Sequence, residues 1–451
     1  MNAPFEKISK NFDDKVTLDD KYLKTSGRIF LTGTQALIKL PMLQKNSDLI
    51  QGLNTAGFIS GYRGSPLGSV DQAAIKAKSF LDKYSIHFHP GLNEDIAATS
   101  IWGSQQVNLF KGANYDGVFS MWYGKGPGVD RSGDVFKHAV GAATSKYGGV
   151  LALAGDDHAA KSSTNAHQSE HILKASGMPV LYPSSVQEYL DFGLHGWAMS
   201  RFTGLWVAMK CVTDIVESGA TVDIDPERIK ILLPEDFEMP EGGLNIRWPD
   251  EILEQEYRLV NYKWYAALAY AKLNNLNHVV WDSPNAKLGI ISVGKSYADT
   301  REALNDLGLN KESASAIGIK LFKVGMSWPL DGQAIRNFAS GLIELIVVEE
   351  KREILESQIK SELYNLPDNK RPRIIGKMNN SGEWSCDLKK LKYNNILPNN
   401  YQLDPYIITK LIGARFLINF SGHPYENSIK NSIDSIERIN NNSNLLTSKP
   451  F

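Results

Sequence analysis

Short apolar runs of strand length recur through the first half of the chain, with helix-like segments between them. The runs are nearly continuous in apolar residues and lie at residues 29–31, 55–61, 117–122, 149–154, 179–183 and 205–209. A strand that is apolar along its whole length is covered on both faces, as in parallel sheets flanked by helices. The alternation therefore predicts an α/β fold with a doubly wound parallel sheet over residues 26–235.

The remaining patterning predicts further units in a chain of 451 residues, which is long enough for two or three domains. Residues 236–284 combine an acidic, proline-rich connector with a predicted helix over 250–276, whose apolar spacing suits packing on a neighbour. Strand-like runs at 287–294, 319–324 and 343–350 predict a second, smaller α/β domain over 285–385. We expect residues 1–25 to form a surface arm and residues 386–451, where the periodicity weakens, to begin a connector.

The composition excludes several classes of function. Lys and Arg number 49 against 50 Asp and Glu, and no basic run is interleaved with aromatic residues, so neither nucleic acid nor an anionic membrane is an expected partner. No window approaches the length of a membrane span. Cys211 and Cys386 are far apart and form no CxxC pair, so a cytoplasmic location without a cysteine-held metal is predicted.

Glu94 is the first candidate for a functional side chain. It follows the break at Pro90 and Gly91 and opens an apolar, small-residue helix that offers little to pair with a charge. A buried carboxyl there keeps its proton unless a ligand supplies a partner. The alternative is that Glu94 and Asp95 are simply the acids that the positive end of a helix favours.

Two glycine-rich segments follow predicted strands. Residues 62–68 come directly after the strand at 55–61, and residues 125–131 form a predicted turn before a helix over 135–147. In an open α/β sheet such segments lie at the carboxyl ends of the strands, where ligands collect.

Taken together, these segments resemble the amino-terminal part of the bacterial, fused indolepyruvate ferredoxin oxidoreductases, which are thiamine-diphosphate-dependent 2-oxoacid:acceptor oxidoreductases. The resemblance covers about residues 15–451, and the segments that carry it are residues 60–68, 91–94, 124–131, 155–158, 162–164 and 348–352. It implies that the first unit is a pyrimidine-binding domain and that the second is similar to the transketolase C-terminal domain. It also implies that Glu94 is catalytic, hydrogen-bonding N1′ of the cofactor's aminopyrimidine.

The resemblance further implies a set of binding residues. Arg63, with its fork of donors, and Ser65 would hold the 2-oxoacid carboxylate, and Tyr62 and His167 would also face the substrate. Gly64 and Lys125 would lie on the cofactor. The alternatives stay open: Arg63 in a solvated glycine turn, and Lys125 facing a phosphate, the substrate or a carboxylate.

The polar residues that end the strand at 149–154 have a simpler interpretation. Asp156, Asp157 and His158 are adjacent in sequence, and adjacent side chains rarely point to one metal, so a capped strand end is predicted. Residues 162–164 and His167 form a polar loop, in which a hydrogen-bonded turn is the default expectation. A histidine in such a loop is nevertheless suited to shuttling protons.

The reaction implied is the oxidative decarboxylation of indolepyruvate or another aryl 2-oxoacid to an acyl-CoA, with coenzyme A and ferredoxin as partners. The chain shows neither a Gly-Asp-Gly turn followed by Asn, which would hold the diphosphate through Mg²⁺, nor cysteines for 4Fe–4S clusters. We therefore expect these groups in a missing part, inactivity of the chain alone, and a homo-oligomer or a partner chain. The alternatives are a non-catalytic α/β interaction subunit or gene remnant, and a thiamine enzyme of the transketolase or decarboxylase type.

Overall fold

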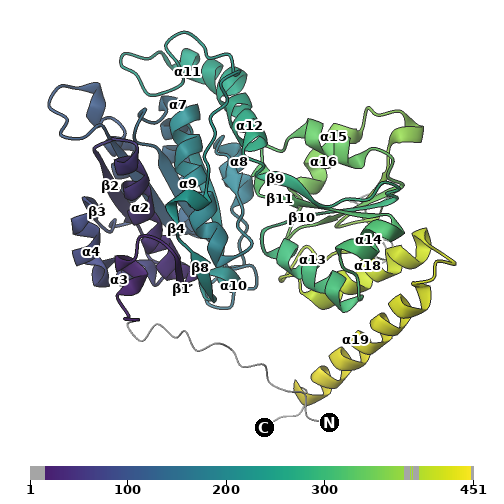
Figure 1. Ribbon diagram of the computed structural model, residues 1–451. Coiled ribbons are helices and arrows are strands. Elements are labelled where there is room, and N and C mark those ends of the chain that lie inside the picture. The colour runs from purple at the N-terminus through teal and green to yellow at the C-terminus, as the bar shows by residue number, and fades with distance from the viewer. Residues whose placement is uncertain (1–15, 380–385, 388, 390–395, 448–451) are drawn as a thin grey trace.

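The computed structural model describes residues 16–379, 386, 387, 389 and 396–447, and these form two α/β units side by side (Figure 1). The first unit is built on a seven-stranded sheet in the order β12-β6-β7-β5-β4-β2-β3, parallel except for β12. Its strands are β2 (Thr55–Gly61), β3 (Ile86–Phe88), β4 (Gly117–Lys125), β5 (Val150–Asp156), β6 (Val180–Leu181), β7 (Trp206–Val212) and β12 (Met326–Trp328).

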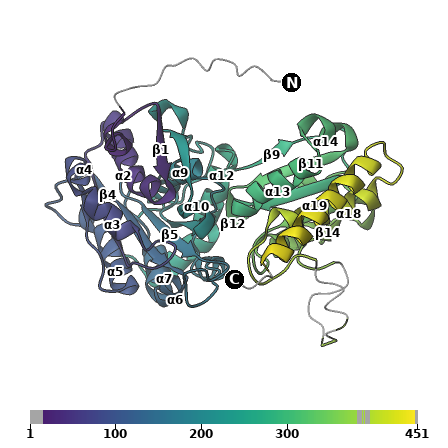
Figure 2. The same ribbon diagram turned by 90° about the horizontal axis from the view of Figure 1, so that it is seen from below.

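Helices cover both faces of this sheet, as the apolar strands require. Figure 2 shows α2 (Gly33–Ile50) and α9 (Val186–Thr203) on one face, and α5 (Glu94–Ser104), α6 (Gly126–Arg131) and α7 (Gly133–Ala142) on the other. Strands β4, β5 and β7 are buried almost throughout. The predicted doubly wound parallel sheet is therefore confirmed.

The ends of the helices in the first unit depend on local interactions. The chain after β1 (Arg28–Thr32) forms one 18-residue helix, α2, which begins with a reciprocal capping box between Thr32 and Gln35. The predicted glycine-rich turn at 125–131 is a direct junction, in which β4 runs to Lys125 and α6 begins at Gly126. Residues 70–83 form two short helices, α3 (Val70–Lys76) and α4 (Lys78–Lys83).

The amino-terminal region is anchored where it is described. Strand β1 (Arg28–Thr32) pairs with β8 (Gly219–Asp223) in a two-stranded antiparallel sheet. The short helix α1 (Asp20–Leu23) buries Tyr22, and the buried Lys39 ammonium donates to the carbonyl oxygens of Tyr22 and Lys24. Residues 16–25 are thus tied to the body, whereas the rest of the predicted surface arm, residues 1–15, lies outside the described residues.

The second unit has a five-stranded sheet in the order β14-β13-β10-β11-β9, in which only the β9 edge is antiparallel. Its strands are β9 (Asn277–Trp281), β10 (Leu288–Val293), β11 (Ile319–Val324), β13 (Glu344–Val348) and β14 (Arg373–Ile375). Helices α13 (Gly294–Asp306), α14 (Lys311–Ile317) and α18 (Pro405–Asn419) pack with one face, and α15 (Gly332–Ala339) and α16 (Leu355–Leu363) pack with the other.

This second unit extends beyond the predicted bounds of 285–385. It begins with β9 at Asn277, and its core includes buried Ile408, Ile412 and Phe416 of α18 and Ile429 of the long helix α19 (Glu426–Thr447). Residues 396–447, expected to begin a connector, therefore belong to the unit, because their isoleucines pack on α13 and on each other. The other expected connector residues, 380–385, 388, 390–395 and 448–451, lie outside the described part.

The helix predicted over residues 250–276 is buried on its packing face in its second half only. It comprises α11 (Ile252–Arg258), a π-helical turn at Leu259–Lys263 and α12 (Trp264–Leu273). The predicted packing face holds in α12, where Tyr270 is fully buried and its hydroxyl contacts Nδ1 of His195 at 2.9 Å. In α11, Leu253 and Tyr257 are exposed, because this helix lies at the rim of the molecule.

The two units share one hydrophobic core. Ile291 and Leu345, on one face of the second sheet, pack into the same cluster as the interior of the first sheet. Strand β12, which follows β11 in sequence, pairs antiparallel with β6 of the first sheet. The position of the second unit is thus fixed by packing and by backbone hydrogen bonds as well as by its linker.

Candidate functional site

The predicted site residues gather at the carboxyl ends of three neighbouring strands. Strands β2, β4 and β5 are parallel, so their ends at Gly61, Lys125 and Asp156 meet at one edge of the sheet. The segment 62–68, helix α6 and the polar loop at 157–169 start there, and α5 begins next to them. Ligands of open α/β sheets bind at this edge.

Glu94 is buried at the start of α5. Asn93 caps the helix by accepting the Ile96 N–H at 2.9 Å, and the indole N–H of Trp122 donates to the Glu94 carbonyl oxygen at 3.1 Å. The Glu94 side chain is only 7% exposed and lies against Gly124 and Gly128. Within the described residues, its carboxylate has neither a hydrogen-bond nor an ion-pair partner. A buried carboxylate without a partner is costly, so this one is suited to receive a donor from a ligand.

Arg63 and Lys125 bring two cations to the same edge. The Lys125 stem lies across Gly64, where an added Cβ would stand 2.6 Å from its Cδ. Arg63 is exposed and Lys125 is half-buried. Neither has an ion-pair partner among the residues that the structure describes, so both are available to a ligand anion.

Ser65 and Tyr62 belong to the loop that these cations flank. The Tyr62 N–H donates to the Tyr123 carbonyl oxygen at 3.0 Å, which extends the pairing of β2 with β4 past the strand end. The Ser65 hydroxyl contacts that of Ser162, and the Ser163 hydroxyl donates to the Ser65 carbonyl oxygen at 3.2 Å. The predicted polar loop therefore closes on the 62–68 segment.

Asp157 holds that polar loop in place. Its carboxylate accepts the backbone N–H groups of Lys161, Ser162 and Ser163 at 3.1, 2.8 and 3.2 Å. These hydrogen bonds, against the opposing effect of burial, lower the pKa of Asp157. The expected capped strand end is present here, with the cap directed at the loop beside Ser65.

His167 lies between two carboxylates at the start of α6. Its Nε2 is 2.9 Å from Oδ2 of Asp130, and its Nδ1 is 3.6 Å from Oδ1 of Asp156. The Asp156 carboxylate, followed by that of Asp130, raises the pKa of His167 although partial burial opposes this. The ring lies directly over Gly126, where an added Cβ would stand 2.6 Å from the His167 Cβ.

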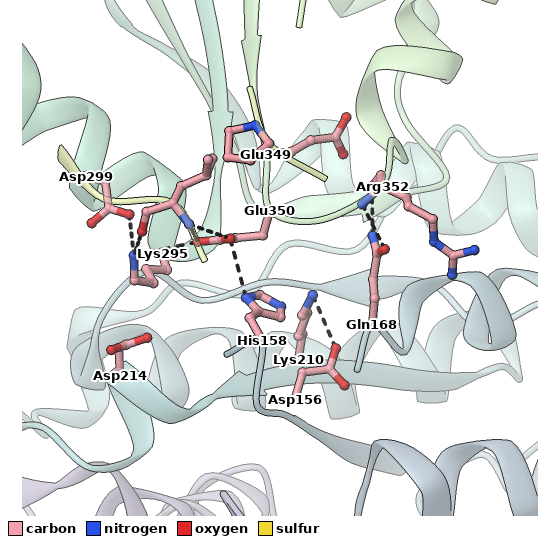
Figure 3. A network of polar contacts seen from close by, with 12 residues as sticks. Asp156, His158, Gln168, Lys210, Asp214, Lys295, Asp299, Glu349, Glu350 and Arg352 are labelled. Atoms are coloured by element: carbon pink, nitrogen blue, oxygen red, sulfur yellow. Dashed lines mark hydrogen bonds and ion pairs between the residues drawn. The ribbon is translucent and has the colours of Figure 1, made fainter. Parts of the chain in front are cut away.

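A buried charge cluster behind the site was missed from the sequence. Lys210 of β7 is fully buried and lies 3.3 Å from Oδ2 of Asp156 (Figure 3). Its ammonium group is also 2.6 Å from Oε1 of Glu170 and lies over the Tyr182 ring. A lysine inside the apolar run 205–212 is the signal that marks it, because an unpaired charge there would be prohibitively costly.

The same strand end also reaches the second unit. Nδ1 of His158 is 3.7 Å from Oε2 of Glu350, whose carboxylate also accepts the Leu403 N–H (Figure 3). Burial and then the Lys210 charge lower the pKa of His158 well below its ordinary value, so its imidazole is neutral. Asp156, Asp157 and His158 thus point to three different partners, as expected of adjacent residues that share no metal.

Glu349 and Glu356 are buried acids of the second unit that accept backbone N–H groups. Glu349 caps α16, accepting the N–H groups of Ile354, Leu355 and Glu356 at 2.8, 2.9 and 2.9 Å, and burial raises its pKa to about 7. Glu356 is fully buried and accepts the Lys377 N–H at 2.7 Å.

Two searches of the described residues bear on metals and membranes. No group of three or more His, Cys, Asp or Glu side chains is arranged to hold a metal ion within residues 16–379, 386, 387, 389 and 396–447. No helix in the same part of the chain is long and apolar enough to cross a membrane.

Comparisons with known proteins show what this chain is similar to. Residues 277–445 match the family model described as the indolepyruvate ferredoxin oxidoreductase middle domain. The chain is 24% identical over 332 residues to indolepyruvate oxidoreductase subunit IorA of Methanothermobacter marburgensis, covering 74% of this chain and 48% of that one. It is 25% identical over 351 residues to the same subunit of Pyrococcus horikoshii, covering 75% and 47%. The chain thus spans about half the length of the curated relatives it matches.

A solved structure bears on the fold alone. The 2-oxoglutarate:ferredoxin oxidoreductase of Magnetococcus marinus superposes with a TM-score of 0.59 at 15% identity, over 86% of this chain and 65% of that one. This likeness agrees with the α/β architecture predicted from the sequence. The comparisons therefore confirm the predicted resemblance: this chain is similar to part of an indolepyruvate ferredoxin oxidoreductase subunit, and its homologues are oxidoreductases.

Proposed function

We propose that this chain is the pyrimidine-binding part of a thiamine-diphosphate-dependent 2-oxoacid:ferredoxin oxidoreductase. The observation that carries the proposal is the buried Glu94 carboxylate, which has no partner in the described chain and lies at the ligand-binding edge of a doubly wound sheet. The proposed reaction is oxidative decarboxylation of indolepyruvate or another aryl 2-oxoacid to an acyl-CoA. The similarity to indolepyruvate oxidoreductase subunits supports this substrate class.

The residues at the edge fit half of a thiamine site. When bound, thiamine diphosphate would supply a carbon nucleophile for the keto carbon of a 2-oxoacid. Glu94 would hold the ring nitrogen of the aminopyrimidine, and Gly124 and Gly128 leave the space in which its carboxylate lies. The diphosphate, its Mg²⁺ and the 4Fe–4S clusters would be held by residues outside this chain.

Arg63 and Lys125 are suited to bind the carboxylate of the 2-oxoacid substrate. Arg63 can donate to the 2-oxoacid carboxylate with two parallel N–H groups, and Lys125, over Gly64, adds a second positive charge. Ser65 offers a hydroxyl and Tyr62 an aromatic ring. The two carboxylate neighbours of His167 raise its pKa, so its imidazole would hold a proton beside the reacting group.

The surface beside Glu94 suits a partner domain. Leu92 is 84% exposed and Ile96 is 47% exposed, and both lie at the start of the helix that Glu94 opens. Apolar side chains in this position favour cover by a second copy of the chain or by a partner chain, which would complete the site from the open side. Coenzyme A and ferredoxin would be the acyl acceptor and the electron acceptor of the assembled enzyme, which we expect in the cytoplasm.

The test compares Glu94→Gln with Asp95→Asn in the enzyme assembled from the chain and its native partners. Asp95 is the matched control, because it is the next acid of the same helix and forms only a surface pair with Arg131 at 3.0 Å. Glu94→Gln should lower the oxidation of indolepyruvate, and deuterium exchange at C2 of the cofactor, by at least about 100-fold. Asp95→Asn should leave both close to the wild-type rates.

Equal rates in both variants would overturn the proposal. Stability separates it further from the view that Glu94 merely favours the helix start. That view predicts a loss of about 0.3–1 kcal/mol in the free energy of unfolding for either variant. The proposal predicts that Glu94→Gln does not lower stability, because the buried carboxyl group that it replaces has no partner within the described residues.

A second candidate is a non-catalytic α/β interaction subunit or gene remnant. The absence of a Gly-Asp-Gly turn and of cysteine pairs from the sequence favours it. Purification of the tagged chain from its native cells distinguishes the two. A partner that carries those motifs supports the enzyme, whereas a partner without them supports the interaction subunit. The combined segments at 62–68 and 125–131 make a thiamine enzyme of the transketolase or decarboxylase type the weaker alternative.

A further inference from the structure

Lys210 is a charged residue at the centre of a sheet. It lies on β7, between β5 and β6, in a strand whose residues are all buried, and its own exposure is zero. Its ammonium group contacts Glu170 of α8 (Glu170–Ala175) at 2.6 Å and Asp156 of β5 at 3.3 Å. One cation therefore serves two buried carboxylates.

Asp156 connects this cation to the candidate site. Its carboxylate accepts the Ser169 N–H at 2.9 Å and the Ser169 hydroxyl at 2.6 Å, and it faces Nδ1 of His167 at 3.6 Å. Lys210 and then His167 lower the pKa of Asp156, although complete burial acts in the opposite direction. Figure 3 shows Lys210 and Asp156 side by side below the junction of the two units.

The charged groups that face this chain of contacts come from four elements. His167 is faced by Asp156 from β5 and by Asp130 from α6. Asp156 is faced by Lys210 from β7 and lies near Glu170 of α8, and His158, two residues further on, is neutral. Without the Lys210 charge, Asp156 and Glu170 would lose the cation that they share. Asp156 would then take up a proton more readily, although the charge of Lys351, in the loop after β13, also acts on it.

We infer that Lys210 is a positioning residue, which holds the Asp156 carboxylate toward His167 and thereby favours the protonated form of His167 over the start of α6. The geometry of these three side chains carries this step. Its meaning for catalysis rests on the proposed function, because the edge where His167 lies also holds Glu94 and Lys125.

The test is a titration of His167 in the purified chain, without cofactor or substrate. Histidine labelled with ¹³C is followed by NMR as a function of pH, and the His167 signal is assigned by its loss in His167→Gln. In the wild type the pKa of His167 should lie above the ordinary value of 6.5. In Lys210→Met the pKa of His167 should fall. Asp156 takes up a proton more readily without the Lys210 charge, and a neutral Asp156 no longer stabilises the imidazolium.

Two further variants make the result specific. Lys39→Met removes another fully buried lysine, which donates to the Tyr22 and Lys24 carbonyl oxygens, and should leave the His167 titration unchanged. Glu170→Gln removes one of the two carboxylates that pair with Lys210, so that Lys210 pairs with Asp156 only. The pKa of His167 should therefore stay raised. A folded Lys210→Met chain in which His167 titrates as in the wild type would refute the inference.

The double variant Lys210→Met/Glu170→Gln carries the test if the single variant does not fold, since it removes one cation and one carboxylate together. The pKa of His167 should fall in this variant as well, and an unchanged titration would refute the inference. The outcome is independent of the Glu94→Gln experiment. Loss of the thiamine proposal would leave these titrations as they are, and an unchanged titration would leave the Glu94 result intact.

Discussion

Gly128→Ala tests the cradle around Glu94 without touching its charge. An alanine Cβ at this position would stand 2.7 Å from Oε1 and 2.8 Å from Cδ of Glu94, whereas ordinary contact begins at 3.4 Å. The carboxyl group must therefore move by several tenths of an ångström away from the position that it occupies against Gly128.

The magnitude follows from two opposing effects. Alanine favours the helical backbone of α6 by up to about 1 kcal/mol, whereas overpacking of a closed site costs about 1–3 kcal/mol. The free energy of unfolding should therefore be unchanged or fall by up to about 2 kcal/mol. Activity is more sensitive, since a misplacement approaching 1 Å costs about 100-fold in rate.

Urea unfolding of the chain and the indolepyruvate oxidation rate of the assembled enzyme measure the two effects. Gly103→Ala is the matched control: it lies on the same helix as Glu94, and an added Cβ there meets nothing within 4 Å. It should be as active as the wild type and up to about 1 kcal/mol more stable. Full activity in Gly128→Ala would show that the position of Glu94 does not matter for the reaction, and would refute the reasoning.

Three further predictions concern stability. Burial, and then the charge of Arg258, lower the pKa of Lys263 to about 7. The free energy of unfolding should therefore rise with pH between about 7 and the ordinary lysine pKa of 10.5. Urea unfolding measured across this pH range should show a smaller rise in Lys263→Met. Arg201→Met leaves the buried Asp48 carboxylate without its bidentate partner and should cost about 3–5 kcal/mol, against less than about 0.5 for the exposed Lys78→Met, by calorimetry. Thr32→Ala removes half of the α2 capping box and should cost about 1 kcal/mol in the same measurement.

Much of the first sheet could be predicted because its strands are apolar on both faces. Runs such as 149–154 and 205–209 leave few alternatives to a strand covered by helices. The strand ends also follow from this pattern, since parallel neighbours place their carboxyl ends together. The segments that hold Arg63 and Lys125 are therefore predicted at such an edge, and the structure brings them together there with Glu94.

The relations between distant segments were not predictable in this way. Helix α19 is rich in Asn and Ser, which have no strong preference for helix, and it forms because Ile429 packs on the second unit. Lys210 was overlooked because its partners, Asp156 and Glu170, come from other elements. Periodicity describes a segment by itself, whereas these features depend on what each segment meets.

Strand β12 makes the order of synthesis matter for the first sheet. It is translated after β9, β10 and β11 of the second unit, yet it pairs with the outer side of β6. Until residues 326–328 leave the ribosome, the backbone N–H and C=O groups of β6 remain an open edge, to which another chain can pair. The first unit, although it precedes the second in sequence, therefore completes its sheet only after the first three strands of the second sheet have been made.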